Sequence, residues 1–484
     1  MQWHKETDVV VIGYGAAGGA AAIEAHDLGA QVVILEKNPE PGGITQHAGG
    51  RMREVVDPKK YVDVMEALCE GTTPRDVLEA FVFEGERNPE WIRKLGGEIE
   101  PAGDSFDNPD KFPIRTDPAV KGIEVVSHEK KYWVKGDARG GANLMSLLKR
   151  NITARKISVL LETPVRRLVK GEKGQGIIGV IAETSNRSEI NIKARRGVVL
   201  ACGGFEGNPD MQRNFLGIVY LPFCNPNNTG DGIKMAMEVG SDLWHMNALN
   251  ASYGYKIPGY DAPVPKRMPA PGYIYLDHKG KRFCDEGSTD PTMLWSIMGQ
   301  MKVRDFAYPR IPTYVIFDEN TMRSGPIGDH RGRITDLYLW SKDNRKELEA
   351  GWIKMGRNLG ELAGKLGIRA DILQETVGQY NLRCVQGYDP EFDRDPRTLV
   401  PLLQPPFFAV EAWPCVTNTQ GGPRRDARAR VLDVWGKPIR RLYSAGELGS
   451  LWNRVYLGSN NVKECLAFGR IAARNIVAEP PWDE

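Results

Sequence analysis

The sequence lacks any apolar run approaching the roughly 20 residues of a membrane-spanning helix. Its first apolar run, Val9 to Ile12, leads into a glycine-rich turn and not into a signal-peptide cleavage site. It also lacks an excess of positive charge, since 64 Lys and Arg face 62 Asp and Glu and leave a formal net charge of +2. Surfaces that follow nucleic-acid phosphates need a larger surplus. We therefore expect a cytoplasmic protein with neither a membrane span nor a nucleic-acid partner.

Cysteine is sparse and its spacing shows no pairing. None of the seven cysteines stands in a CxxC or CxxCH arrangement, which argues against a disulfide framework and against a haem attachment site. We expect most of them to be buried thiols. They are Cys69, Cys202, Cys224, Cys284, Cys384, Cys415 and Cys465.

The chain has no internal repeat and no low-complexity tract. Hydrophobic residues make up 41% and charged residues 26% of its 484 residues, which is ordinary for a folded protein and excludes wholesale disorder. At roughly 150 residues per domain, this length allows about two to four domains with ample apolar core.

The N-terminal residues carry a strand, turn, helix, strand pattern. It consists of an apolar run at 8–12, the turn GYGAAG at 13–18, an alanine-rich helix to about 28 and a second apolar run at 32–35. Gly13 permits a tight turn, Gly15 lets backbone approach a pyrophosphate, and Gly18 lets the helix pack closely on the strand. The start of the helix then binds phosphate, and Glu36 accepts a hydrogen bond from a ribose hydroxyl. The pattern predicts a dinucleotide site in an α/β domain.

The remaining chain divides by composition. The glycine-rich loop at 41–50 suits backbone that passes against a flat cofactor, and 52–97 read as helical, with Thr73 as N-cap and Pro74 at the first position of the second helix. Alternating apolar runs at 158–200 predict a small antiparallel insertion that returns to the main parallel sheet.

A change in composition marks a second unit. Residues 245–355 are aromatic, proline-rich and irregular, whereas 356–390 read as helical and a last helix is expected at about 461–477. We expect a discontinuous first domain at 1–244 and 356–484, with a substrate cap domain at 245–355 inserted into it.

These motifs together resemble the superfamily of fumarate reductases and 3-ketosteroid dehydrogenases. They are GYGAAG at the start, PGGIT at 41–45, TGDG at 229–232, GKRFCDE at 280–286, LYSAGELGS at 442–450 and YLGSNNVKECLAFGRIA at 456–472. The resemblance covers nearly the whole chain. It implies an α/β fold in which a Rossmann-like FAD-binding domain is built from both chain ends and an inserted α+β cap places the substrate against the flavin.

The resemblance also implies which residues contact FAD. A helix N-terminus at Asn461 and Val462, with Glu447 beside it, would stabilise negative charge on the pyrimidine ring of the reduced flavin. The full implied set is Gly13, Gly15, Ala16, Ala17, Gly18, Glu36, Lys37, Gly43, Ile44, Thr45, Ala48, Gly49, Gly50, Val165, Ala201, Gly203, Thr229, Asp231, Glu447, Asn461 and Val462.

Departures from the family pattern narrow the expected attachment of FAD and the expected class of substrate. Members that attach FAD covalently carry a histidine where this chain has Ile44, so the resemblance implies non-covalent FAD. Fumarate reductases hold their dicarboxylate with arginine and histidine side chains, because a dianion leaving water needs charge-assisted partners. Here Asp290 stands near the place of the proton-donating arginine, Leu249 or Asn250 near that of the histidine, and Tyr456 at that of the late arginine. These differences argue against a fumarate reductase.

The late turn, residues 456–460, instead matches the ketosteroid dehydrogenase pattern. In that branch a tyrosine and a backbone N–H four residues later bind the substrate ketone, and Tyr456 and Asn460 reproduce this spacing. Two neutral donors aimed at a carbonyl oxygen stabilise the enolate that develops as the α-proton leaves, each worth about 3 kcal/mol of barrier. A packed aromatic side chain with a satisfied hydroxyl is the alternative reading of Tyr456.

The general base is less clear from sequence. The family's catalytic tyrosine falls at about Asp290, which could act as the base if burial raised its pKa. Asp290 precedes Pro291, however, and a helix N-cap explains that pair equally well. Tyr253, Tyr255 and Tyr275 are the reserve candidates.

Three further features of the sequence each have two possible interpretations. Arg454 could pair with a carboxylate on the substrate or lie at the surface. Trp295, Trp413 and Trp452 could line an apolar pocket or belong to the core. The arginine cluster at 424–430 reads as a solvated turn before the strand ARVLDV rather than as a docking patch.

We therefore expect an FAD-dependent enzyme that desaturates a cyclic ketone next to its carbonyl, such as a 3-ketosteroid or an oxo-cyclohexane carboxylate. The alternative is an ene-reductase of an α,β-unsaturated acid or ketone, and a lesser one is a flavoprotein with structural FAD. No fused haem or FMN segment is visible, so either enzyme needs a separate electron acceptor or donor.

Overall fold

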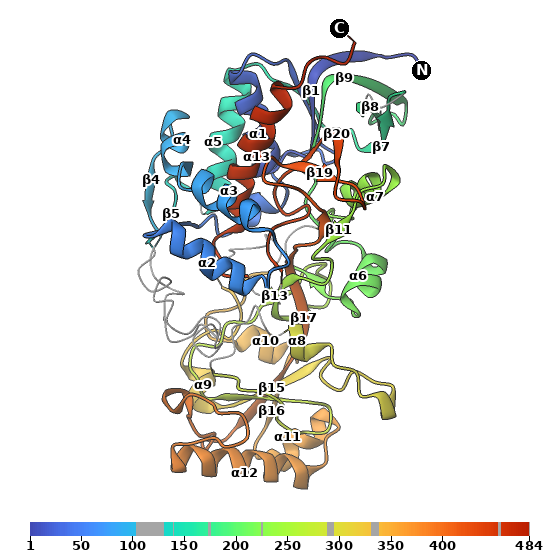
Figure 1. Ribbon diagram of the computed structural model, residues 1–484. Coiled ribbons are helices and arrows are strands. Elements are labelled where there is room, and N and C mark those ends of the chain that lie inside the picture. The colour runs from blue at the N-terminus through green and yellow to red at the C-terminus, as the bar shows by residue number, and fades with distance from the viewer. Residues whose placement is uncertain are drawn as a thin grey trace.

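The computed structural model describes residues 1–102, 130–138, 140–172, 176–223, 226–287, 295–330, 338–453 and 456–483. The elements gather into two units, each around its own sheet (Figure 1). Both chain termini lie at the same end of the molecule, in the unit opposite to α11 (Leu359–Leu366) and α12 (Ala370–Gln386).

The first sheet has a parallel centre in the order β20-β9-β1-β2-β6. Its central strands are apolar on both faces, and Val9, Val10 and Val11 are fully buried. One face packs against α1, α5 and α13, and the other against residues of β7, β8 and α7. Its strands are β1 (Lys5–Ile12), β2 (Val32–Leu35), β6 (Ser158–Leu160), β7 (Val165–Lys170), β8 (Ile177–Glu183), β9 (Glu189–Leu200), β19 (Arg430–Leu432) and β20 (Pro438–Ser444).

The expected antiparallel insertion is present. β7 pairs antiparallel with β8 and β8 with β9, and β9 then runs parallel to β1 in the main sheet. The connection therefore leaves the parallel sheet and returns to it beside the first strand.

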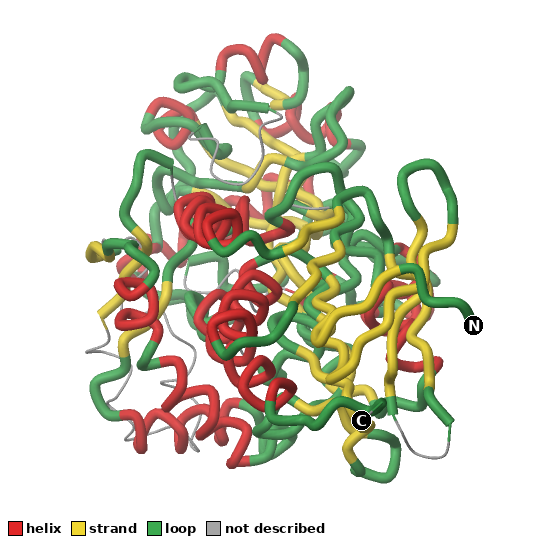
Figure 2. Tube along the Cα trace, turned by 90° about the horizontal axis from the view of Figure 1, so that it is seen from above, coloured by secondary structure: helices red, strands yellow, loops and turns green. Residues whose placement is uncertain are grey.

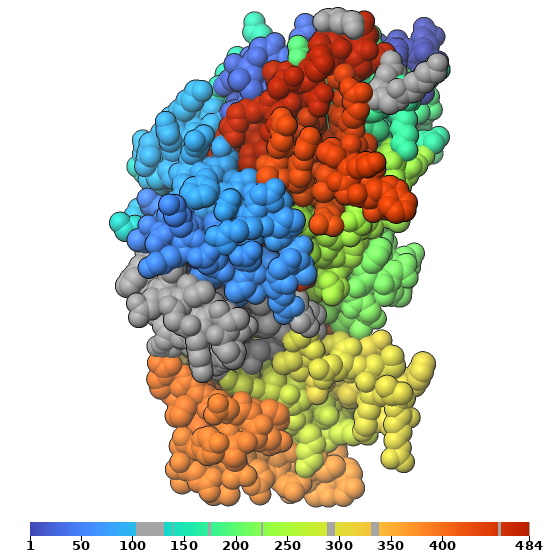
Figure 3. Space-filling model, in the orientation of Figure 1, coloured from blue at the N-terminus to red at the C-terminus, as the bar shows by residue number. Residues whose placement is uncertain are grey.

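The first and last long helices of the chain pack against each other. α1 (Ala16–Asp27) is rich in alanine, and a Cβ on Gly469 of α13 (Asn461–Val477) would lie only 2.7 Å from the Ala17 carbonyl oxygen. Small residues thus allow the close approach that joins both chain ends in one unit. The space-filling view shows both ends of the colour scale gathered there (Figure 3), and the view from above labels both termini (Figure 2). The other helices of this unit are α2 (Pro58–Leu68), α3 (Arg75–Gly85), α4 (Asn88–Lys94), α5 (Gly141–Ala154), α6 (Pro209–Leu216) and α7 (Asp231–Glu238).

Short elements complete the first unit. A three-stranded sheet consists of β3 (Met52–Glu54), β5 (Lys130–Val134) and β4 (Ile99–Pro101), and β11 (Leu243–Trp244) pairs with β18 (Gly422–Pro423). A 3-10 turn, η1 (Gly43–His47), forms the glycine-rich loop after β2.

The second sheet is built around a long strand near the end of the chain. β17 (Phe407–Thr419) pairs with strands on both sides, in the order β13-β12-β17-β15-β14. The remaining elements are β10 (Leu221–Pro222), β12 (Leu249–Tyr255), β13 (Val264–Pro265), β14 (Tyr273–Leu276), β15 (Thr313–Asp318), β16 (Ile353–Gly356), α8 (Trp295–Met298), η6 (Val303–Asp305), α9 (Glu319–Arg323), α10 (Arg345–Glu349) and η7 (Pro396–Thr398).

The residues that pack with the second sheet extend beyond the expected cap at 245–355. β17 lies in the middle of the second sheet, and α11 and α12 bury Leu362, Leu373 and Val377 with residues of β14 and β15. Residues 356–419, which the sequence analysis assigned to the first domain, thus pack with the second sheet. We propose a cap that ends near residue 419 in place of 355.

Two local expectations are wrong. Pro74, not Thr73, stands at the N-cap of α3, and the Thr73 hydroxyl donates to the Leu451 carbonyl instead. The arginine cluster is not wholly solvated, because Arg425 is fully buried and forms an ion pair with Glu464 of α13. Its guanidinium also lies 4.2 Å from the centre of the Phe468 ring.

Across the described ranges, no helix is both long enough and apolar enough to cross a membrane.

Candidate FAD and substrate site

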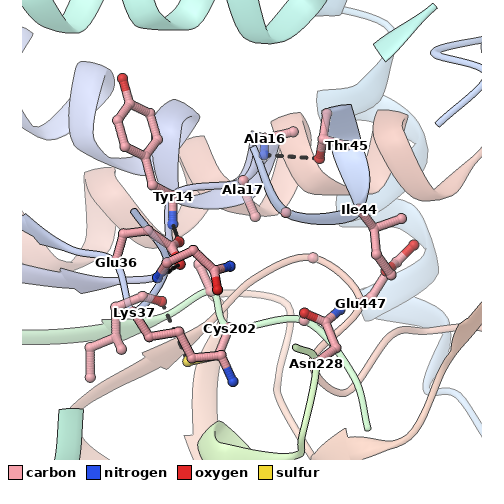
Figure 4. A pocket seen from close by; sticks show the side chains of 18 of the residues that line it. Tyr14, Ala16, Ala17, Glu36, Lys37, Ile44, Thr45, Cys202, Asn228 and Glu447 are labelled. Carbon is pink, nitrogen blue, oxygen red and sulfur yellow. Dashed lines mark hydrogen bonds between the residues drawn. The ribbon is translucent and has the colours of Figure 1, made fainter. Parts of the chain in front are cut away.

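A pocket opens where the carboxyl ends of β1, β2 and β9 meet the start of α1. Its empty space, open mouth included, is about 930 Å³. Figure 4 shows Glu36 and Lys37 at one end and Ile44 and Glu447 at the other. The pocket therefore lies at the edge of the parallel sheet where α/β folds bind dinucleotides.

The glycines of the first turn differ in how much room their surroundings leave for a side chain. Gly13 has φ +101°, and a Cβ there would lie 2.4 Å from the Ala201 carbonyl oxygen. A Cβ on Gly18 would lie 1.9 Å from the Gly13 oxygen, whereas one on Gly15 meets nothing closer than Thr45 Oγ1 at 3.6 Å. Gly13 and Gly18 thus allow close packing, whereas Gly15 lines the pocket at the start of the helix without such a clash. The start of a helix is where a pyrophosphate binds in dinucleotide-binding folds.

Polar side chains fix both sides of this turn. Glu36 accepts hydrogen bonds from the Tyr14 N–H at 2.8 Å and the Asn38 N–H at 2.9 Å, and it is 6% exposed. Thr45 Oγ1 accepts from the Ala16 N–H at 3.1 Å (Figure 4). The carboxylate of Glu36 is therefore held in place at the end of β2, with lone pairs left to accept from a ribose.

A lysine connects two distant segments at the same end of the pocket. Lys37 Nζ lies 2.7 Å from Asp231 Oδ2 and 3.0 Å from Thr229 Oγ1. The Thr229 hydroxyl donates to Asp231 at 2.9 Å, and Lys37 and Thr229 both hold the pKa of Asp231 below its usual range. Thr229 itself lies behind the pocket lining.

Most of the implied cofactor residues line the pocket. Those that do are Gly13, Gly15, Ala16, Ala17, Glu36, Lys37, Gly43, Ile44, Thr45, Ala48, Val165, Ala201, Gly203, Asp231, Glu447 and Val462. The lining does not include Gly18, Gly49, Gly50, Thr229 or Asn461. Gly50 has a packing task, since a Cβ there would lie 2.1 Å from the Gly140 backbone.

Several lining residues were not expected from the sequence. They are Tyr14, Thr163, Pro164, Cys202, Asn228 and Cys465, among others. Tyr14, Pro164, Cys202 and Asn228 directly adjoin expected residues, so adjacency was a usable signal for them. Thr163 comes from the β6–β7 connection, two residues before the expected Val165.

The late turn places a phenol at the start of α13. Tyr456 Oη accepts hydrogen bonds from the backbone N–H groups of Asn460 at 3.2 Å and Asn461 at 3.1 Å. The sequence analysis expected the phenol and the Asn460 N–H to bind a ketone side by side, whereas here the N–H donates to the phenol. Burial raises the pKa of Tyr456 to about 12, so the phenol keeps its proton at neutral pH and remains a donor.

Two buried carboxyls lie beside this turn. Glu447 Oε1 accepts from the side-chain amide of Asn461 at 3.1 Å, and burial together with the charge of Glu206 raises the pKa of Glu447 well above its usual range. Glu206 accepts from Asn228 Nδ2 at 2.6 Å and from Thr419 Oγ1 at 3.0 Å, and burial raises its pKa to about 7. Glu447 lines the pocket, whereas Glu206 lies outside its lining.

The tyrosines held in reserve as bases belong to the core of the second unit. Tyr253 Oη lies 2.7 Å from Thr313 Oγ1, and Tyr255 donates to the Ile327 carbonyl at 3.2 Å. The rings of Tyr253 and Tyr275 meet edge to face at 5.2 Å, and burial raises the pKa of all three phenols. None of them lines the pocket, and Tyr456 and Asn460 do not line it either.

Other expected residues fall outside the site or outside the described ranges. Asp290 and Arg454 lie outside the described residues. Trp452 is fully buried, with edge contacts to Phe81 at 6.1 Å and Tyr456 at 5.5 Å, so it is core that supports the phenol. In the part of the chain that the structure describes, no group of three or more His, Cys, Asp or Glu side chains could hold a metal ion.

Comparison with known proteins identifies the family. A family model described as an FAD binding domain matches residues 8–462. The fumarate reductase (cytochrome) of Shewanella frigidimarina is 27% identical over 485 residues, which cover 97% of this chain and 76% of that protein. The 4-oxocyclohexanecarboxylate 2-dehydrogenase of Sinomonas cyclohexanicum is 26% identical over 557 residues, covering 98% and 93%.

A solved structure has the same fold. The 3-ketosteroid Δ1-dehydrogenase of Sterolibacterium denitrificans, in complex with 1,4-androstadiene-3,17-dione, superposes with a TM-score of 0.80 at 24% identity, covering 98% of this chain and all of the other. The glycine turn, the fixed Glu36 and the pocket that Gly15 lines at the start of α1 fit FAD. The chain belongs to the FAD-binding domain family and is an FAD-dependent oxidoreductase.

Proposed function

We propose that this enzyme desaturates a cyclic ketone between its α and β carbons. The observation that carries the proposal is the Tyr456 phenol, which accepts two backbone N–H bonds at the start of α13 and keeps its own proton to donate. FAD, when bound, supplies the two-electron oxidant that accepts the β-hydride. The substrate loses the α-proton to a base, and the electron pair left behind becomes the new C=C bond.

Tyr456 stabilises the charge that develops on the carbonyl oxygen. The two N–H groups withdraw electron density from the phenol oxygen, and they lie where the helix dipole is positive. The phenol O–H therefore becomes a stronger donor to an enolate than to a ketone, which is the selectivity for the transition state that catalysis requires. In this arrangement Asn460 acts through Tyr456 and not directly on the ketone.

We propose Asp290 as the base, because the described alternative Tyr253 is bound to Thr313 in the core of the second unit. An Asp290→Asn variant should reduce flavin at least about 100-fold more slowly in a single turnover, the usual contribution of a general base. Near-normal flavin reduction would remove Asp290 from this role.

We further propose that FAD is bound without a covalent bond. The lining residue at the position of the family's attachment histidine is Ile44, whose side chain offers no nucleophile. Acid precipitation of the yellow protein should leave all flavin in the supernatant, and flavin that stays with the pellet would contradict this.

The partners proposed are a cyclic ketone or enoate as substrate and a separate electron acceptor or donor, in the cytoplasm. The cysteines that the structure describes are free thiols, which accords with a reducing compartment. If Arg454 faces the substrate, it would favour an oxo-acid, and Arg454→Ala should then impair only carboxylated substrates.

The alternative function is an ene-reductase of an α,β-unsaturated ketone or acid. It is favoured by relatives named as reductases, including the fumarate reductase above. The same phenol would then protonate or polarise the substrate in the reverse direction.

Tyr456→Phe tests the proposal most simply. The variant keeps the ring that packs on Trp452 and removes only the donor. Loss of one such donor should lower the flavin reduction rate by about 100- to 1000-fold. An unchanged rate would show that the phenol is only a packing residue.

A further inference from the structure

We propose that Arg53 is a positioning residue that holds the Tyr456 turn in its reactive shape. The inference rests on the proposed role of Tyr456. Arg53 belongs to β3, is 2% exposed and donates to two successive carbonyls of the turn. Its Nη2 lies 2.6 Å from the Leu457 oxygen and its Nε 3.0 Å from the Gly458 oxygen.

The turn needs such a partner because of its backbone. Gly458 has φ +63° and Ser459 has φ +58°, so two successive residues are left-handed. For the non-glycine residue this costs about 1–2 kcal/mol. Leu457 and Gly458 also direct their carbonyls toward the interior, where an oxygen without a donor would cost a further 1–3 kcal/mol or so. A planar guanidinium that donates to both carbonyls compensates for both costs.

The shape of this turn decides where the phenol lies. The chain must reverse between Tyr456 and Asn460 for the Asn460 and Asn461 N–H groups to reach the phenol oxygen. A second contact supports the same shape: the Asn460 side-chain amide donates to the Gly458 carbonyl at 3.0 Å and to Tyr61 Oη at 3.2 Å. Arg53 and Asn460 thus bind the same carbonyl from two sides.

Arg53 also connects the turn to the cofactor loop. β3 follows η1 and Ala48, which line the pocket, after only a few residues. β3 is itself fixed by pairing with β5, where Met52 lies opposite Tyr132. The same short segment therefore forms part of the pocket wall and holds the turn that carries the phenol, which sets the position of the donor relative to the bound cofactor.

The charge of Arg53, like its hydrogen bonds to the turn, favours the proposed role of Tyr456 as a donor. A buried cation close to the phenol favours negative charge on its oxygen and opposes the effect of burial on the pKa of Tyr456. A phenol that tolerates partial negative charge is a better donor to an enolate. The positioning role thus includes tuning of the donor.

Hydrogen exchange followed by mass spectrometry tests the structural part without any substrate. Arg53→Gln removes the charge and leaves one donor nitrogen, and Arg53→Lys keeps the charge but replaces the planar fork with a single donor nitrogen. Exchange in a peptide spanning 456–461 should become at least about tenfold faster in the Gln variant and less so in the Lys variant. The matched control is Arg470→Lys, whose arginine is equally buried on α13 but binds Glu84 and Asn88.

Kinetics test the link to Tyr456. Arg53→Gln should lower kcat for the ketone that reduces the flavin by about 10- to 100-fold, with KM changed less than about threefold, and should raise the α-deuterium isotope effect as proton removal slows. In a Tyr456→Phe background the same substitution should have little further effect, because coupled residues are not additive. A merely destabilised protein would lose active sites without changing the isotope effect.

The exchange and kinetic results distinguish a failure of the Arg53 role from a failure of the Tyr456 role. Unchanged exchange at 456–461 in both variants overturns the role of Arg53. Faster exchange with unchanged kcat and isotope effect overturns it as well, provided that Tyr456→Phe is impaired. If Tyr456→Phe itself is fully active, the proposed enolate role of Tyr456 is wrong. The inferred role of Arg53 is then wrong as well, because it depends on Tyr456.

Discussion

A Cβ atom on Gly13 would lie 2.4 Å from the carbonyl oxygen of Ala201, so the first turn and the end of β9 pass each other with no room for a side chain. Gly15, two residues on, lines the pocket, and a Cβ there would meet nothing closer than 3.6 Å. We therefore expect separable tasks for the two glycines of this motif, packing for the first and cofactor access for the second.

Alanine substitutions separate these tasks. Gly13→Ala should destabilise the fold even without FAD, because a φ of +101° and the clash with Ala201 both oppose a side chain. Gly15→Ala should leave the stability of the apoprotein within about 1 kcal/mol of wild type and weaken FAD binding at least about tenfold. Thermal unfolding of apoprotein and flavin-fluorescence titration check the pair. Equal behaviour of the two variants in both assays would contradict the assignment.

The buried Glu206 predicts a pH dependence of stability. Its pKa is about 7 in the folded chain against 4.5 in the unfolded one, so the unfolded state ionises first as the pH rises. The contribution of Glu206 to stability is therefore fully present below pH 4.5 and is lost by about pH 7. The unfolding free energy of wild type minus that of Glu206→Gln should fall across this window by on the order of 3 kcal/mol.

Urea unfolding at several pH values measures this difference. The exposed Glu189→Gln variant on β9 serves as control. A difference that rises with pH, or a flat one, would mean that Glu206 is not the proton-binding group inferred from its burial.

The buried ion pair of Arg425 and Glu464 predicts strong coupling between two distant segments. Glu464 also accepts from the Leu451 N–H at 3.1 Å and the Ser450 hydroxyl at 2.7 Å, so it fixes the segment that follows Glu447. Glu464→Gln leaves a buried guanidinium without its counter-charge and should cost about 3–5 kcal/mol of unfolding free energy.

A double variant and an exposed pair provide the comparison. Arg425→Met with Glu464→Leu should be less destabilised than either single variant, because no charge is left buried alone. Asp371→Asn, which breaks the exposed pair with Arg369, should change the unfolding free energy by less than about 1 kcal/mol. Additive losses in the double variant would contradict the coupling.

The nucleotide-binding half of the fold could be predicted because its signals are local. Strand, glycine turn, helix and acid follow one another within 36 residues, and the last helix starts where its apolar pattern starts, at Asn461. The extent of the cap could not be predicted in this way. β17 joins the second sheet by pairing with strands far away in sequence, and such pairing leaves no mark on local composition.

The same contrast between local signals and distant contacts applies to the residues of the site. The resemblance to 3-ketosteroid dehydrogenases singled out Tyr456 and Asn460, and the structure joins them by a hydrogen bond from the Asn460 N–H to the phenol. Arg53 was not identifiable in this way, since its partners Leu457 and Gly458 are about 400 residues away and are backbone carbonyls, which any residue type provides. Arg425 was misread because a charged cluster in a turn usually faces solvent, and its partner Glu464 is on another element.

The direction of the reaction and its substrate class are tested most directly by anaerobic titration of the yellow holoenzyme with steroid ketones, cyclohexanone derivatives with and without carboxylates, and saturated dicarboxylates. The proposed dehydrogenase predicts that a cyclic ketone bleaches the flavin and that Tyr456→Phe does so at least about 100-fold more slowly. No bleaching by any ketone, followed by reoxidation of the chemically reduced enzyme by an enone or enoate, would contradict the proposal and make the protein a reductase.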